Sequence, residues 1–64
     1  MTKTTLNFAS MAEARAHFLK QGYYTVDEGT DSYIMCNYAN GSKVAEAIIN
    51  RKGFLCVVAE VLER

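Results

Sequence analysis

Residues 32–50 read SYIMCNYANGSKVAEAIIN, and this stretch determines the architecture of the chain. At its centre, Asn40 and Gly41 form the dipeptide most typical of a two-residue β-hairpin loop, because both residues accept the positive φ of a type I′ turn. The flanking segments are rich in β-branched, aromatic and small residues. They predict antiparallel strands over about 32–39 and 43–50.

Residues 42–50 also fit a short helix with Ser42 as its N-cap. That alternative gives the element order β-α-β-β-α-β of the ferredoxin-like fold. The strand pairing favours the first interpretation, since two-residue loops at 40–41 and 51–52 would create one apolar face on the last three strands. This face contains Ile34, Cys36, Ala45, Ala47, Ile49, Phe54, Cys56 and Val58, and a Lys43–Glu60 cross-strand pair closes it.

Upstream of the hairpin, the sequence contains a helix start. Ser10 and Glu13 have the spacing of a capping box, in which each side chain accepts a hydrogen bond from the other residue's backbone N–H. Good helix formers follow as far as Gln21, and Gly22 suits the left-handed position that ends a helix. We therefore predict one amphipathic helix over about residues 11–21.

Short strands complete the expected fold. The alternation of Thr4, Leu6 and Phe8 with polar residues predicts a short N-terminal strand, and aromatic and β-branched residues predict strands over about 23–27 and 54–62. We expect a single α+β domain over residues 1–64, in which the helix packs on an antiparallel β-meander of four strands.

Composition limits the function classes. The 64 residues include seven Lys and Arg against seven Asp and Glu, and half are hydrophobic, which argues against disorder and against nucleic-acid coating. No apolar run approaches the roughly 18–20 residues of a membrane span, and the N-terminus shows no basic-then-apolar leader. We therefore expect a cytoplasmic protein without a membrane partner.

A domain of this size buries only about 60% of the surface of its unfolded chain, so its stability is low unless a disulfide, a metal or a partner subunit adds to it. Neither a disulfide nor a metal is expected here. Cys36 and Cys56 lack metal-type spacing and are predicted to be reduced, buried and inert on the helix-facing side of the sheet. His17 is expected on the solvated flank of the helix, and there is no glycine-rich phosphate loop or acid–base pair. We predict no enzymatic activity, no cofactor and no metal, which leaves a partner subunit as the supplement.

The predicted pairing also places apolar residues on the second face of the sheet, opposite the helix. One helix covers one face, so this second face would be an exposed apolar surface of the kind that marks interaction sites. Six of its residues are expected to form a self-association face, namely Tyr33, Met35, Val44, Ile48, Leu55 and Val57. The alternative is that the sheet curls and the N-terminal strand covers this surface.

Charged residues supply candidate contacts with a different partner: the acidic loop residues Asp27, Glu28 and Asp31, and the adjacent bases Arg51 and Lys52. A short, neutral, non-enzymatic chain has the format of accessory proteins of phages and mobile elements, such as anti-CRISPR proteins. We expect a protein-binding inhibitor that occludes a surface of a larger assembly, as a monomer or a homodimer. The alternatives are a purely structural homo-oligomer subunit and a sheet-based nucleic-acid-binding module, which the scarcity of clustered bases disfavours.

Overall fold

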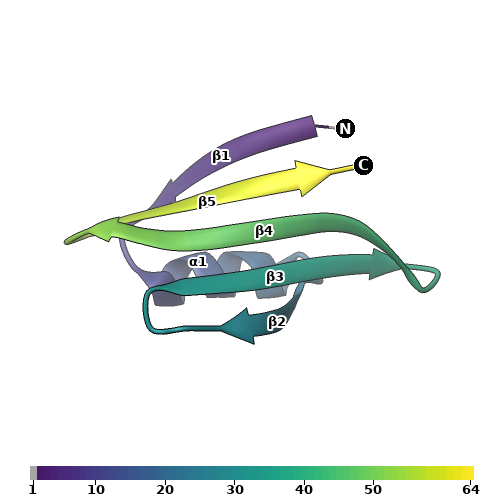
Figure 1. The fold of residues 1–64 in the computed structure, drawn as a ribbon, viewed down its shortest axis with the longest axis horizontal. Coiled ribbons are helices and arrows are strands. Elements are labelled where there is room, and N and C mark those ends of the chain that lie inside the picture. Colours follow the sequence, from purple (N-terminus) through teal and green to yellow (C-terminus); the bar gives the residue numbers. More distant parts are fainter. Residues whose placement is uncertain (1) are drawn as a thin grey trace.

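The fold is a five-stranded antiparallel sheet with one helix packed on one face. The computed structural model describes residues 2–64, and Figure 1 shows the sheet with the helix behind it. The elements are β1 (Thr2–Phe8), α1 (Met11–Lys20), β2 (Tyr24–Glu28), β3 (Ser32–Ala39), β4 (Ser42–Gly53) and β5 (Cys56–Glu63). Their order across the sheet is β1-β5-β4-β3-β2, so β2 to β5 form a meander and β1 lies beside β5.

This architecture confirms the predicted α+β class and the antiparallel meander after the helix. Residues 42–50 lie within strand β4, so the ferredoxin-like alternative with a second helix is wrong. The strand is favoured here because β4 pairs with both β3 and β5, which satisfies its backbone groups on two edges. Among the described residues, no helix is long and apolar enough to cross a membrane.

The helix α1 begins where its sequence predicts and ends one residue earlier than predicted, at Lys20. Ser10 is extended, with a φ of −149°, and its Oγ accepts a hydrogen bond from the Glu13 N–H at 3.1 Å. The Glu13 carboxylate accepts from the Ala9 N–H at 3.3 Å, one residue earlier than a capping box has it. After the C-cap residue Gln21, Gly22 adopts a φ of +92° and turns the chain towards β2.

The core lies between α1 and the middle of the sheet. Its helix side consists of Met11, Ala14 and Phe18, and its sheet side of Met35, Ala45, Ala47, Ile49, Val57, Ala59 and Val61. Three of the sheet residues are alanines, and their small side chains leave room for the larger Phe18 and Met11 above them. Leu6, Phe8 and Tyr33 pack against this core but are only half-buried.

The β3–β4 hairpin has the predicted turn but not the predicted register. Asn40 and Gly41 have φ values of +53° and +80°, as a type I′ turn requires. Below the turn, a β-bulge at Val44 shifts the pairing of β3 with β4 by one residue. Because a one-residue shift exchanges the two faces of a strand, Met35 rather than Cys36 faces the helix.

The β4–β5 turn lies later in the chain than predicted. β4 continues to Gly53, which pairs with Cys56, so the turn residues are Phe54 and Leu55 instead of residues 51–52. The helix-facing residues of β5 are therefore Val57, Ala59 and Val61, and the predicted set at 54, 56 and 58 is wrong. The observed register extends the β4–β5 ladder and leaves Phe54 and Leu55 outside the core.

Candidate functional site

The six residues predicted to form a self-association face do not share one surface. Met35 and Val57 are fully buried beneath α1, and Tyr33 is half-buried at the margin of the same core. The other three lie at separate places: Val44 at the β-bulge, Ile48 on the uncovered face of the sheet and Leu55 at the β4–β5 turn. The shifted registers explain this, because each odd shift exchanges the two faces of a strand.

The face of the sheet opposite α1, here called the open face, is a mixed surface and not the continuous apolar one expected from the sequence. Apolar and charged side chains lie next to each other on it; Ile48, for example, pairs with Glu60 of β5. Ion pairs of Lys3 with Glu60 (3.2 Å) and of Lys43 with Glu46 (2.7 Å) replace the expected Lys43–Glu60 pair. Its central apolar side chains are each only partly exposed.

The most exposed large apolar side chain, Phe54, lies with Leu55 at the β4–β5 turn. Figure 1 shows this turn at one end of the sheet. Phe54 is 92% exposed and Leu55 is 64% exposed. Leu55 also has a φ of +58°, in the left-handed region that costs an L-residue about 1–2 kcal/mol. Neither the exposed apolar area nor the backbone strain stabilises the folded chain, and their occurrence in one turn is typical of a functional site.

The neighbouring β2–β3 loop holds the base of this turn. The Arg51 N–H donates to the Asp31 carbonyl oxygen at 2.9 Å, and Arg51 Nε donates to Asp31 Oδ1 at 3.1 Å. The structure thus joins two of the five charged residues predicted to contact a partner in one ion pair. Of the other three, Glu28 pairs with an arginine of α1 at 3.5 Å, whereas Asp27 and Lys52 make no ion pair within residues 2–64.

We define the tip surface as Phe54 and Leu55 together with the polar residues around them, Arg51, Lys52 and Asp31. Its centre is apolar and its surroundings are charged, which is the arrangement found in protein–protein interfaces. Because Arg51 and Asp31 neutralise each other, the exposed Lys52 leaves the tip surface with a positive charge. The tip surface therefore combines an apolar anchor with one free cation.

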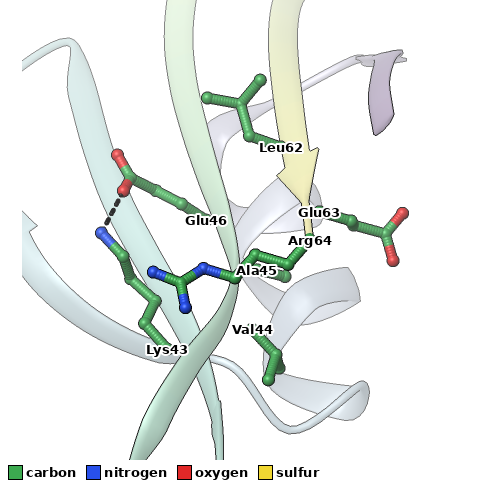
Figure 2. A pocket seen from close by; sticks show the side chains of 7 residues that line it. All are labelled: Lys43, Val44, Ala45, Glu46, Leu62, Glu63 and Arg64. Carbon is green, nitrogen blue, oxygen red and sulfur yellow. Dashed lines mark hydrogen bonds and ion pairs between the residues drawn. The ribbon is translucent and has the colours of Figure 1, made fainter. Parts of the chain in front are cut away.

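A pocket of about 230 Å³ lies beside the β-bulge, at the other end of β4 (Figure 2). It is lined by Lys43, Val44, Ala45, Glu46, Leu62, Glu63 and Arg64. Figure 2 shows the ion pair of Lys43 with Glu46, and this hydrogen bond raises the pKa of Lys43. The charges of Lys43 and Glu46 compensate each other. None of the lining residues is a nucleophile with a neighbouring base, so the pocket contains no candidate catalytic pair.

The cysteines and the histidine differ from prediction. Cys36 is buried, but on the open face, and Cys56 is exposed beside the β4–β5 turn, so only one of these free thiols is shielded. His17 is half-buried, and its ring centre lies 5.3 Å from that of Phe8 and 5.0 Å from that of Phe18. In the part of the chain that the structure describes, no three His, Cys, Asp or Glu side chains are grouped to hold a metal ion.

The tip surface is the feature that sequence reasoning misses, since that reasoning places Phe54 in a buried strand and Leu55 on a sheet face. A signal for it exists in the alternation of apolar residues on the two strands, since pairing Ala47 with Val61 and Ile49 with Ala59 moves the turn to Phe54 and Leu55. No protein-family model, curated protein or solved structure matches the chain, so its function has to be inferred from its own surfaces.

Proposed function

We propose that the chain is a non-enzymatic protein-binding module and that the tip surface is its contact with a larger protein. The observation that carries this proposal is the 92% exposure of Phe54 on a turn whose next residue, Leu55, is held at positive φ. Interface energy concentrates in a few anchoring side chains surrounded by polar residues. Phe54 and Leu55 fit the role of anchors, because they are exposed next to each other in one turn.

The tip surface has enough unburied apolar area to contribute to binding. Full burial of a Phe or Leu side chain contributes about 1.5–3 kcal/mol. At 92% and 64% exposure, Phe54 and Leu55 retain most of that gain, or about 2–5 kcal/mol together before the costs of association. The hydrogen bonds of Arg51 with Asp31 hold the turn in place, which lowers the entropy lost when a partner binds it.

Charge indicates the kind of partner site that accepts the tip surface. Lys52 is exposed and unpaired in the described part of the chain, so an apolar pocket with a carboxylate at its rim fits best. The chain has no net charge, so short-range contacts rather than long-range attraction would govern affinity. The mode of action that follows is occlusion: the module covers a functional surface of the partner, as expected for an inhibitor of the phage or mobile-element type.

The proposal is tested by capture from a lysate of the native host, followed by binding measurements with the purified partner. We compare the wild type with Phe54→Ala and with a matched control, Val26→Ala, which truncates an apolar side chain that is 52% exposed on β2. Loss of an anchor costs about 2 kcal/mol or more, so Phe54→Ala should weaken the Kd at least about 30-fold. Wild-type affinity of Phe54→Ala, with lost binding of Val26→Ala, would place the contact on β2 and refute the proposal.

A further inference from the structure

Strand β1 is an unprotected edge of the sheet. It lies at the end of the strand order and pairs with β5 along all seven residues without a bulge. Its outward N–H and C=O groups therefore have no strand partner within residues 2–64. Such an edge is a template for another strand unless something blocks it.

The opposite edge, β2, shows the protection that β1 lacks. β2 has five residues and an irregularity between Thr25 and Asp27, and both Asp27 and Glu28 are exposed. Short length, a bulge and charged side chains all discourage edge pairing. β1 is longer and regular, and its one charged residue, Lys3, is already paired with Glu60 at 3.2 Å. The two edges thus differ in length, in regularity and in unpaired charge.

The helix side of β1 borders two hollows that a second strand could fill. One, of about 260 Å³, is lined by residues that include Leu6 of β1 and His17 of α1. The next is lined by Phe8, Ala16 and again His17. Leu6 and Phe8 are only half-buried beside α1. An added strand would therefore pair with the free backbone groups of β1 and also cover these two side chains.

We propose that two copies of the chain pair antiparallel through β1, which joins their sheets into one of ten strands. A twofold axis at Thr5 sets Thr5 opposite its own copy and Lys3 opposite the partner's Asn7, so no like charges meet. The same register sets Leu6 opposite the partner's Thr4, over the first hollow. Each copy thereby places its Leu6 side chain beside the first hollow of the other copy. The chains carry no net charge, so they do not repel each other.

Sedimentation equilibrium from about 10 μM to about 1 mM tests this pairing, because a seven-residue edge is a small interface with a Kd in this range. The average mass should rise from 7.1 kDa towards twice that value. Thr5→Lys places a lysine beside Glu60 within one chain but opposite a second lysine in the dimer, so the Kd should weaken about tenfold or more. Thr30→Lys, with the same charge change in the exposed β2–β3 loop, should leave the Kd unchanged.

The register is tested by cross-linking in a Cys56→Ser background, which removes the exposed native thiol. Thr5→Cys should form a disulfide-linked dimer under mild oxidation. Lys3→Cys should not, because its two copies would lie about 13 Å apart along the strands. A monomer at every concentration overturns the proposal, as does a dimer that survives Thr5→Lys and is lost in Ile48→Glu on the open face. Either result leaves the proposed function of the tip surface unaffected.

Discussion

Replacing Leu55 with glycine and, in a second variant, with alanine tests the left-handed backbone of the tip surface. Both changes remove the same side-chain atoms beyond Cβ, so lost contacts cancel in the comparison. At a φ of +58°, alanine keeps a strain of about 1–2 kcal/mol that glycine does not have. Glycine loses about 0.5–1 kcal/mol more backbone entropy on folding. We therefore expect Leu55→Gly to be more stable than Leu55→Ala by about 0.5–1 kcal/mol.

The assay is urea unfolding of both variants, with thermal unfolding as a second measurement. In a chain of this size, about 1 kcal/mol corresponds to a difference of about 4–8 °C in Tm. Ala16→Gly is the control, because Ala16 is exposed on α1 and its helical backbone favours alanine by about 1 kcal/mol. If glycine is also the less stable residue at position 55, then Leu55 is not left-handed in solution, and the inference of strain at the tip surface fails.

Three further predictions concern the fold. Cys56 should react with a thiol reagent in the folded protein while the buried Cys36 reacts only on unfolding, and mass spectrometry counts the added groups; two fast thiols would contradict the burial of Cys36. Ser10→Ala should lower the free energy of unfolding by about 1 kcal/mol, since Ser10 Oγ accepts from the Glu13 N–H. Burial, with a smaller effect of the Glu63 charge, raises the pKa of Tyr23 above its usual value of 10.0. The unfolded chain then loses this proton first, so stability should fall as pH rises above 10, and Tyr23→Phe should reduce that loss.

Local chemistry explains which parts of the fold are predictable. The cap at Ser10, the turn residues Asn40 and Gly41, and the glycine after the helix each depend on a few neighbouring residues, and the structure confirms them. The helix-facing residues of β4 are also correct, since Ala45, Ala47 and Ile49 all lie in the core.

The registers of β3 and β5 depend on packing across the sheet and are not predictable in this way. The bulge at Val44 has no signature in its own residues, yet it exchanges the two faces of β3 relative to the predicted pairing with β4. Leu55 opposes the usual rule for turns, because a residue with positive φ is normally glycine or asparagine. The turn at Phe54 and Leu55 is missed for the same reason, because its residues contradict the local preference for glycine or asparagine at positive φ.

The geometry of β1 pairing sets the stoichiometry of any complex made by the tip surface. The turn follows the end of β1 that carries Phe8, because Phe8 pairs with Val57. Antiparallel pairing about Thr5 therefore sends the two tip surfaces to opposite ends of the joined sheet, about 34 Å apart along the strands. One pocket cannot accept both, so a dimer should bind two partner molecules, each with the affinity of a single tip surface. Thr5→Lys should then halve the size of the complex without changing the affinity for the partner. A fall in that affinity would show instead that the partner also contacts β1.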